Sequence, residues 1–325
     1  MVKAIVVNEP GPPSVLKIAE RSIPQVKTGW VLLRVRAFGL NRSEMFTRQG
    51  HSPSVQFPRV LGIECVGEVV DGSDSDLQKG QVVTAVMGNM GRDYDGGYAE
   101  YALIPRAYVI PINTDLPWAT LAAIPETFLT AWGSLVEALE VQARQTLLIR
   151  GGTSALGMAA TSMAKDMGLT VLATTRNPNK TEALLANGVD YVILDDGQIA
   201  EKVRELYPQG VDRVLELVGT VTLLDSLQAT APKGIVCQSG ILGNAWTLHE
   251  FEPLAQIPST VKLTAYSSET LTAVNATEPL QMIVDGVVDG RFQPNIDRIF
   301  QFDEIVAAHA YMESNQAKGK LVVVV

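Results

Sequence analysis

The sequence predicts an α/β protein with a doubly wound parallel sheet and a separate antiparallel β domain. The first observation is a strand, a glycine-rich turn, a helix and a second strand, all within about thirty residues near the middle of the chain. The second is an alternation of further strands and helices up to residue 267. The third is a series of short strands near the N-terminus, separated by turns rich in proline and glycine.

The composition is that of an ordinary globular chain. Its 325 residues are enough for two domains with separate cores, and 46% of them are hydrophobic and 19% charged. The net charge of −9 and the lack of a Lys/Arg run interleaved with aromatic residues argue against nucleic acid as a partner. No apolar run reaches the ~18 residues of a membrane span, so we expect no membrane partner and a cytoplasmic location.

Metal-ligating side chains are few and scattered. The cysteines are Cys65 and Cys237, and neither they nor the three histidines show HExxH or CxxC spacing. We therefore predict no metal site built on these residues and no disulfide. Each cysteine is expected to be a small buried hydrophobe.

The N-terminal third is predicted to be antiparallel β structure. Arg34 and Arg36 alternate with Val35 and Ala37, which gives one strand face to solvent and the other to a core. Glycines recur farther on, where neighbouring backbones would approach closely. The predicted strands cover residues 3 to 7, 15 to 19 and 31 to 38, and the glycines are Gly62, Gly67 and Gly72.

The middle of the chain begins with a βαβ unit. The run TLLIRG, from Thr146 to Gly151, is predicted as a strand buried on both faces, and GGTSALG overlaps its end. The helix that includes Gly157 is expected to end at Gly168, and a second strand covers residues 170 to 174. In such a unit the first turn places a pyrophosphate at a helix N-terminus.

The glycine pattern of this turn is looser than GxGxxG, because Ser154 and Ala155 stand in its middle. It can be a tight turn without a ligand or a dinucleotide-binding turn, and the βαβ context favours the second. The turn residues predicted to bind the cofactor are Gly152, Thr153, Ser154, Ala155 and Leu156.

The end of the second strand indicates which dinucleotide binds. An Asp or Glu about 20 residues past the turn would bind the ribose 2′-hydroxyl of NADH, but the chain reads Thr174-Thr175-Arg176, with Lys180 soon after. We therefore predict NADPH, with Arg176 and Lys180 facing the 2′-phosphate and the two threonine hydroxyls in support. The alternative is that Arg176 and Lys180 only begin a solvated helix.

Later strands complete the predicted doubly wound sheet. Glycines at the carboxyl ends of its fourth and fifth strands lie where such sheets bind ligands, so Val218, Gly219, Gly240 and Ile241 are also predicted to bind the cofactor. A helix over residues 271 to 288 follows, with Pro279 expected in its first turn. The third to sixth strands are predicted at 190 to 194, 212 to 219, 234 to 243 and 261 to 267.

Five segments in register produce a resemblance that covers essentially the whole chain. They are LGIECVGEVV, DGGYAEYALIP, FLTAWGSL, LLIRGGTSALG and AKGKLVVVV. Together they resemble the medium-chain dehydrogenase/reductase superfamily, on its zinc-free quinone oxidoreductase branch. The resemblance implies a GroES-like, partly open β-barrel catalytic domain, residues 1–123 and 268–325, and an inserted Rossmann domain for NADPH, residues 124–267.

The resemblance also implies site residues and an assembly. Asn41 and Ser43 match the family's active-site segment after the third strand and are the predicted catalytic residues. Thr130, in FLTAW, matches a threonine that lies near the nicotinamide. The edge strand 261–267 would pair two Rossmann sheets in a homodimer.

Zinc-dependent members of the superfamily bind their catalytic metal at three positions that can be matched by motif. This sequence has Asn41, Ile63 and Glu126 there. Isoleucine offers no ligand atom and an amide binds zinc poorly, so the resemblance implies a metal-free site.

Without a Lewis acid, hydride transfer from NADPH to a quinone or an α,β-unsaturated carbonyl is easier than alcohol oxidation. Asn41 and Ser43 would stabilise the resulting enolate by hydrogen bonds. Phe46 stands in place of a tyrosine that some relatives carry, so Tyr94, Tyr98 or water would supply the proton. Three alternatives stay open: Asn41 only caps a helix, the enzyme is an enoyl-thioester reductase, or the protein binds NADPH without redox activity.

Overall fold

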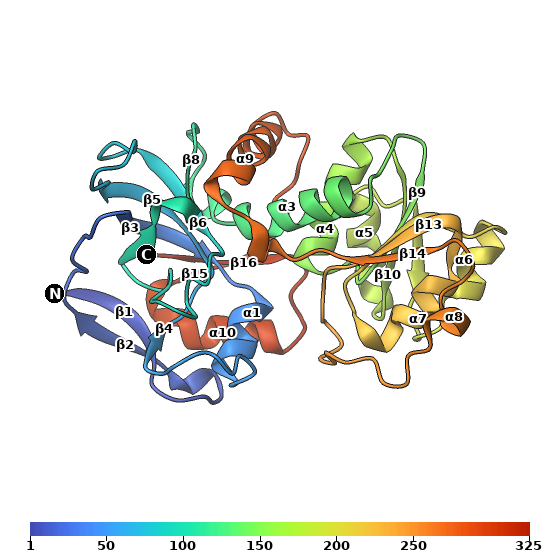
Figure 1. The fold of residues 1–325 in the computed structure, drawn as a ribbon, viewed down its shortest axis with the longest axis horizontal. Coiled ribbons are helices and arrows are strands. Elements are labelled where there is room, and N and C mark those ends of the chain that lie inside the picture. Colours follow the sequence, from blue (N-terminus) through green and yellow to red (C-terminus); the bar gives the residue numbers. More distant parts are fainter. The chain divides into compact units, whose positions relative to one another are not determined.

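The computed structural model describes residues 1 to 325, and its contacts divide the chain into two compact units. The first unit comprises Met1–Leu129, Ser268–Val288 and Pro294–Val325, and the second comprises Thr130–Ser267 and Asp289–Gln293 (Figure 1). The limits drawn from the sequence were 123/124 and 267/268. The structure divides the chain after Leu129, inside helix α3 (Pro125–Trp132), and the short segment Asp289–Gln293 groups with the second unit.

The first unit is built on two sheets. A three-stranded sheet has the order β2-β1-β4, and a larger one has the order β15-β16-β3-β5-β6-β8, with β7 also paired to β3. All strand pairs are antiparallel except β15 with β16, so the predicted antiparallel β region is confirmed. The strands are β1 (Val2–Val7), β2 (Leu16–Arg21), β3 (Trp30–Gly39), β4 (Arg59–Val60), β5 (Glu64–Asp71), β6 (Val82–Val86), β7 (Tyr101–Pro105), β8 (Val109–Pro111), β15 (Ile296–Gln301) and β16 (Lys320–Val324).

Strand β3 shows the expected alternation. Arg34 is exposed and Arg36 half-buried, whereas Val35 and Ala37 lie in the core. A side chain at Gly67 on β5 would put its Cβ only 2.0 Å from the Arg34 carbonyl oxygen. The predicted close approach of neighbouring backbones is therefore confirmed, and glycine is required for β3 and β5 to pair there.

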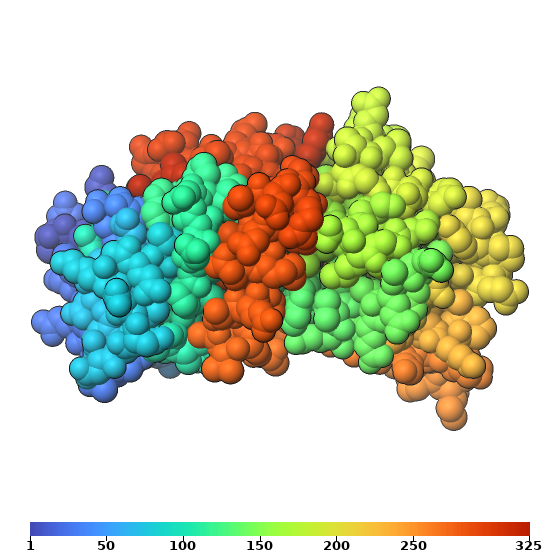
Figure 2. Space-filling model, turned by 90° about the horizontal axis from the view of Figure 1, so that it is seen from above, coloured from blue at the N-terminus to red at the C-terminus, as the bar shows by residue number.

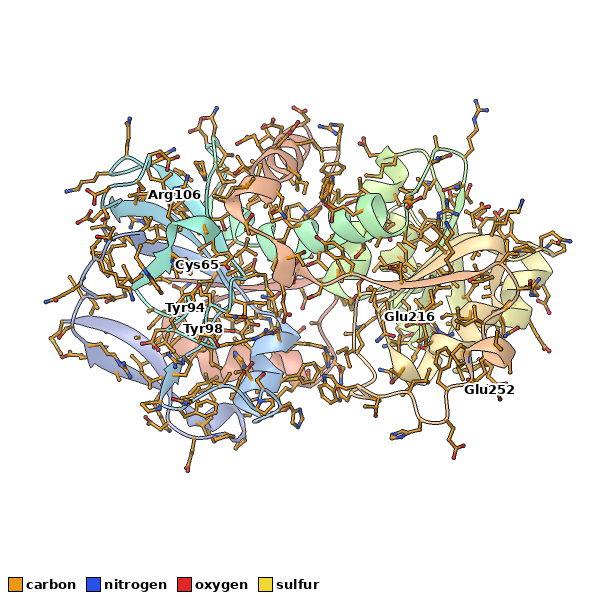
Figure 3. All side chains as sticks on the ribbon, in the orientation of Figure 1. Cys65, Tyr94, Tyr98, Arg106, Glu216 and Glu252 are labelled. Atoms are coloured by element: carbon orange, nitrogen blue, oxygen red, sulfur yellow. The ribbon has the colours of Figure 1, made fainter.

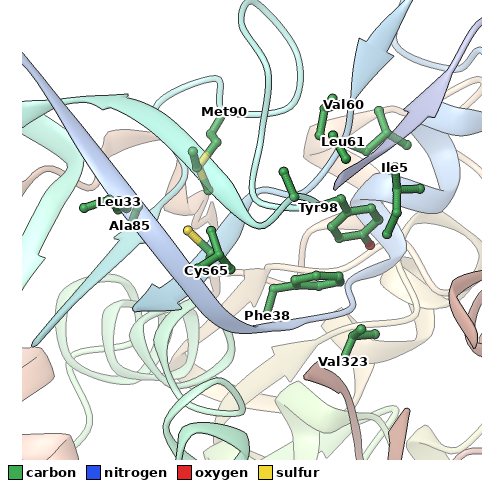
Figure 4. Close-up of a cluster of buried hydrophobic side chains, with 14 of the residues drawn as sticks. Ile5, Leu33, Phe38, Val60, Leu61, Cys65, Ala85, Met90, Tyr98 and Val323 are labelled. Atoms are coloured by element: carbon green, nitrogen blue, oxygen red, sulfur yellow. The ribbon is translucent and has the colours of Figure 1, made fainter. Parts of the chain in front are cut away.

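The core of the first unit is aromatic and aliphatic. Phe38 and Tyr98 are fully buried, and their rings stack with centroids 4.5 Å apart (Figure 4). Cys65 lies in the same cluster, and burial raises the pKa of its thiol to about 12. Both cysteines are buried free thiols, as predicted.

Five helices belong wholly or partly to this unit. Pro279 lies inside α9, seventh of its sixteen residues, so its predicted place in the first turn was wrong. The helix begins close to the expected point, and a proline inside it gives up one backbone hydrogen bond. Figure 2 shows α9 in orange at the surface, where Val274 is 95% exposed. The helices are α1 (Arg42–Arg48), α2 (Trp118–Leu121), α3, α9 (Ala273–Val288) and α10 (Ile305–Glu313).

The second unit contains one fully parallel sheet with the order β11-β10-β9-β12-β13-β14. Strand order reverses between β9 and β12, which is the topological switch point of a doubly wound fold. This confirms the predicted α/β class. The strands are β9 (Thr146–Arg150), β10 (Thr170–Thr175), β11 (Tyr191–Leu194), β12 (Val211–Glu216), β13 (Thr230–Gln238) and β14 (Lys262–Ala265).

The helices of this unit connect successive strands. Helix α4 ends at Asp166 with Met167 as its C-cap, and Gly168 follows with a φ of +77°, so the predicted stop is confirmed. The fifth strand was predicted too late in the chain. Strand β13 starts at Thr230 because an irregularity with a positive φ at Lys233 lets pairing continue through a stretch that resembles a turn. The helices are α4 (Ala155–Asp166), α5 (Thr181–Ala186), α6 (Ala200–Leu206), α7 (Thr220–Gln228) and α8 (Pro253–Gln256).

No helix in the structure combines the length and the apolar character of a membrane-spanning segment.

Candidate active site and cofactor site

The turn between β9 and α4 is tied to the neighbouring strand. The Gly151 N–H donates to Thr174 Oγ1 at 3.0 Å, and the Gly152 N–H donates to the Thr174 carbonyl at the same distance. Gly151 has a φ of +91°, a conformation that favours glycine. These contacts fix the carboxyl ends of β9 and β10 beside one another.

The Ser154 side chain bonds to backbone groups on both sides of the turn. Its hydroxyl donates to the Gly151 carbonyl at 2.8 Å and accepts the Gly157 N–H at 3.0 Å, so it serves as the N-cap of α4. The predicted contact of Ser154 with a cofactor would therefore come from its backbone. Thr153, Ala155 and Leu156 are half-buried at this helix start.

The turn fits a pyrophosphate. A Cβ on Gly157 would lie 2.7 Å from the carbonyl oxygens of both Gly151 and Gly152, so only glycine allows α4 to pack this closely. The N–H groups in the first turn of a helix have no partner four residues earlier. Ser154 caps the Gly157 N–H, which leaves the N–H groups of the half-buried Ala155 and Leu156. These unpaired donors and the helix dipole suit an anion.

The loops after β12 and β13 lie against each other. A Cβ on Gly240 would meet the Leu217 carbonyl oxygen at 2.4 Å, and Gly219, with a φ of +102°, would place one 3.0 Å from the Gly240 carbonyl oxygen. The structure therefore brings the predicted residues Val218, Gly219, Gly240 and Ile241 together at the carboxyl edge of the sheet.

Glu216 holds this loop and was missed by the sequence analysis. Its Oε1 accepts the N–H groups of Val218 and Gly219 at 2.7 and 3.0 Å, and its Oε2 accepts the Ser226 hydroxyl. The residue is fully buried at the end of β12, and burial raises its pKa (Figure 3). A glutamate inside an apolar strand sequence was the available signal.

Arg150, immediately before the glycine turn, was missed as well. Its guanidinium is fully buried and forms a bidentate pair with Asp195, both bonds 3.0 Å long, and a 2.6 Å bond to Asp225. The pair joins the carboxyl ends of β9 and β11, and Asp225 adds α7. Because Arg150 is fully buried, we assign this cluster a structural role next to the turn.

The residues predicted for the 2′-phosphate are placed unequally. Arg176 is exposed directly after β10, as a phosphate ligand should be, whereas Lys180 is only 8% exposed. Thr174 and Thr175 are both buried, and their hydroxyls bond to backbone groups of the turn and of Asn177. Thr130 is also buried, at 5% exposure. Of this set, Arg176 is the side chain open to a ligand.

In the first unit, Asn41 joins a buried polar cluster. Lys320 Nζ donates to Asn41 Oδ1 at 2.6 Å and to Glu64 Oε1 at 2.7 Å, and both Lys320 and Glu64 are 1% exposed. Asn41 Nδ2 donates to Glu64 at 2.9 Å and to Glu44 at 3.3 Å. Every polar atom of the Asn41 side chain is thus bonded within this cluster, which we call the Lys320 cluster: Asn41, Glu44, Glu64 and Lys320.

Backbone groups complete the Lys320 cluster. Glu44 accepts the N–H groups of Asn41 and Ile63 at 2.9 and 3.1 Å, and Glu64 accepts the Glu126 N–H at 2.9 Å. Burial, reinforced by the charge of Glu64, raises the pKa of Glu44 to about 7 against the opposing effects of the Ile63 N–H and the charge of Lys320. Asn41 is the N-cap of α1, so the capping alternative describes part of its role.

The three positions that match zinc ligands do not fit a zinc ion. Asn41 is engaged by Lys320, Ile63 contributes only its backbone N–H, and the Glu126 side chain accepts the Ser268 hydroxyl at 3.1 Å. No group of three or more His, Cys, Asp or Glu side chains in the chain is arranged to hold a metal ion. We derive no chemical step through zinc.

Ser43 offers a different environment. It is half-buried, and its Oγ accepts a hydrogen bond from Arg92 Nη2 at 2.7 Å. Arg92 Nη1 in turn donates to Glu269 at 2.8 Å. Neither Arg92 nor Glu269 was predicted from the sequence, because no local pattern links them to Ser43.

The two tyrosines considered as proton donors are engaged elsewhere. Tyr98 is 0% exposed, and its hydroxyl lies 3.2 Å from His309 Nε2. The Tyr94 hydroxyl donates to the Gly88 carbonyl at 2.9 Å. Burial raises the pKa of both phenols, so neither is suited to protonate a bound acceptor.

Comparisons with known proteins agree with this architecture. The family "Alcohol dehydrogenase GroES-like domain" matches residues 27–114, and the family "Zinc-binding dehydrogenase" matches residues 187–323. A quinone oxidoreductase from Pongo abelii is 27% identical over 329 residues, which cover 99% of this chain and 97% of that protein.

Solved structures extend the similarity. The quinone oxidoreductase from Coxiella burnetii superposes with a TM-score of 0.85 at 27% identity and covers 100% of this chain and 99% of that one. Mycobacterial Rv1454c, solved in complex with NADPH, superposes with a TM-score of 0.88 at 25% identity and 100% coverage of both chains. The chain belongs to the medium-chain dehydrogenase/reductase superfamily, on its quinone oxidoreductase branch, and is an oxidoreductase with the fold that binds a nicotinamide cofactor.

Proposed function

We propose that the protein is a zinc-independent, NADPH-dependent reductase that delivers hydride to a quinone or an α,β-unsaturated carbonyl compound. One observation carries the proposal: the second unit builds a dinucleotide turn, while the polar centre of the first unit is organised around the ammonium of Lys320 and not around metal-ligating side chains. The relatives named quinone oxidoreductase support the acceptor class.

The choice of NADPH rests on the end of β10. No carboxylate follows this strand, and the exposed Arg176 guanidinium is free to pair with a 2′-phosphate. The mycobacterial relative solved with NADPH supports this choice. The pyrophosphate would bind at the backbone of Gly152 to Leu156, and Val218, Gly219, Gly240 and Ile241 would line the remaining cofactor surface.

The first unit would supply the groups that bind the acceptor. When bound, NADPH would supply the hydride to a carbon of the acceptor, and the acceptor oxygen would take up the displaced electron pair. Ser43, whose hydroxyl donates no hydrogen bond within the structure, is the proposed donor to that oxygen. Asn41 would shape and position this site, because both of its N–H groups are committed to carboxylates. Water would protonate the reduced product.

We also propose a homodimer. Strand β14 is an edge of the parallel sheet, paired only with β13, and its Lys262–Ala265 backbone is available for an isologous contact with a second copy. Sedimentation of the purified protein would give twice the monomer mass if this holds. A monomer at micromolar concentration would rule it out.

The function is tested by following NADPH oxidation by EDTA-treated protein with a panel of quinones and enones, and with NADH in parallel. We expect turnover with NADPH that does not increase when zinc is added. NADPH binding without turnover on any acceptor would support the redox-silent alternative, and turnover only after zinc addition would contradict the metal-free proposal.

A further inference from the structure

The guanidinium group of Arg92 is hydrogen-bonded to the hydroxyl of Ser43. Arg92, from the loop between β6 and β7, donates through Nη2 to Ser43 Oγ at 2.7 Å. Its side chain is 21% exposed and therefore largely removed from water. The contact joins residues 49 positions apart, both within the first unit.

This contact fixes the direction of the serine hydroxyl. A hydroxyl has one hydrogen to donate, and an oxygen that accepts from a guanidinium keeps that hydrogen for another partner. No hydrogen bond in the structure uses the Ser43 hydrogen. A charged donor also strengthens the hydrogen bond that its acceptor makes in turn, because bonds in a chain polarise one another.

Glu269 holds Arg92 in place. Its carboxylate accepts from Arg92 Nη1 at 2.8 Å, but it is 58% exposed, so water screens its charge more than that of the arginine. Arg92 Nε is buried without an acceptor. A buried N–H without a partner costs free energy, and Arg92 bears this cost while its two other guanidinium nitrogens bond to Ser43 and Glu269.

We propose that Arg92 is a positioning residue for the reduction: it aims the Ser43 O–H at the acceptor oxygen and supplies the positive charge that stabilises this oxygen as it becomes negative. The inference rests on the proposed function and adds to it the group that takes up the developing charge. No proton leaves Ser43 in this step. The hydride adds to carbon, and the acceptor oxygen gains the electron pair. The Ser43 hydroxyl, which accepts a hydrogen bond from Arg92, donates a hydrogen bond to this oxygen.

The first test needs no turnover. 4-Nitrophenol resembles a reduced quinone and changes colour on ionisation, so its pKa can be measured by titration while it is bound. The wild type is expected to lower this pKa, Arg92→Met to lose most of the shift and Arg92→Lys to recover part of it. An identical bound pKa in the wild type and Arg92→Met, or no spectral change with the wild type, would overturn the inference.

The second test is a double-mutant cycle on NADPH oxidation. Arg92→Met should lower kcat by about 10- to 100-fold with the KM for NADPH unchanged, which is less than the roughly 100- to 1000-fold cost of a lost oxyanion donor because the Ser43 hydroxyl remains. In a Ser43→Ala background the same substitution should cost less than about 3-fold, because Arg92 acts through Ser43. Equal losses in both backgrounds would show that Arg92 acts independently of Ser43 and would refute the inference.

Arg106→Met is the matched control. Arg106 also lies in the first unit and pairs through its guanidinium with a more exposed carboxylate, that of Asp76, at 2.7 Å. This variant removes the same charge and the same kind of ion pair, and it should leave both readouts unchanged. If the wild type reduces no acceptor at all, the proposed function fails, and the nitrophenol titration still decides the role of Arg92.

Discussion

Next to the proposed site of each unit, a buried cation is paired with carboxylates: Lys320 in the first unit and Arg150 in the second. The two clusters differ in whether they contain a residue of the proposed site. In the second unit, Arg150 pairs with Asp195 and Asp225 beneath the turn, and the turn itself is a contiguous run of chain. In the first unit, Lys320 bonds Asn41 directly, across 279 positions of sequence. The proposed cofactor site is therefore a local sequence motif that a separate buried cluster stabilises. In the acceptor site, by contrast, the proposed site residue Asn41 is itself a member of the buried cluster.

This difference predicts where substitutions act. Changes in the turn should affect cofactor binding and leave folding largely intact, because the Arg150 cluster remains. Changes in the Lys320 cluster should affect stability and the acceptor site together, since the same hydrogen bonds serve both.

The largest effect on cofactor binding is expected from Gly157→Val. The new side chain would start 2.7 Å from two carbonyl oxygens and force α4 away from the turn. Binding of NADPH and NADH, measured by fluorescence titration, should weaken by at least about 100-fold, which corresponds to the upper range of overpacking costs. Ala143→Val adds two methyl groups at an exposed position of the second unit, and this variant should still bind both cofactors. Normal binding by Gly157→Val would mean that the turn does not hold the pyrophosphate.

Lys320→Met should mainly destabilise the first unit. The substitution leaves Glu64, at 1% exposure, without its cation, and removing one partner of a buried pair costs about 3–5 kcal/mol. Urea unfolding would measure this cost. Lys318→Met, at an exposed position nearby, should stay within about 0.5 kcal/mol of the wild type. Similar midpoints for the two variants would show that the Lys320 cluster is not a source of stability.

Glu44→Gln tests the same cluster through pH. The pKa of Glu44 is raised by burial from its ordinary value of 4.5 to about 7, so the folded state binds this proton more tightly than the unfolded state does. That contribution to stability is present below pH 4.5 and is lost as pH rises through 7. Its full size is on the order of 3 kcal/mol.

The wild type should therefore lose stability relative to Glu44→Gln as pH rises from about 5 to 8, since glutamine cannot ionise. Urea unfolding of both proteins at several pH values would show this divergence. Parallel stability curves would contradict the raised pKa of Glu44.

The smallest expected effect is that of Arg176→Ala. Loss of a charge-assisted bond to the 2′-phosphate should weaken NADPH binding by about 1–3 kcal/mol and leave NADH binding nearly unchanged. Arg144→Ala removes an exposed arginine elsewhere in the second unit and should change neither. Equal losses for both cofactors in Arg176→Ala would remove the basis for preferring NADPH.

The two sites also differ in how far the sequence predicts them. Gly151 and Gly157 predict the turn between strand and helix, and Gly168 predicts the end of the helix, because each position imposes a local backbone requirement. Arg92 and Glu269 carry no such signal, since their contacts to Ser43 depend on the folded first unit. The start of β13 was misjudged for a related reason: Pro232 and Gly234 resemble a turn, and only pairing with β12 shows that the strand continues.

The central claim is hydride delivery to the acceptor without zinc, and isotope transfer tests it most directly. EDTA-treated protein would be mixed with an enone and NADPH carrying two deuterium atoms at C4 of the nicotinamide, so that the transferred atom is labelled from either face, and the product would be analysed by mass spectrometry and NMR. The account predicts one deuterium at the β-carbon of the reduced enone, in an amount that zinc does not increase. Reduced product without deuterium at that carbon, or labelled product only when zinc is supplied, would contradict it.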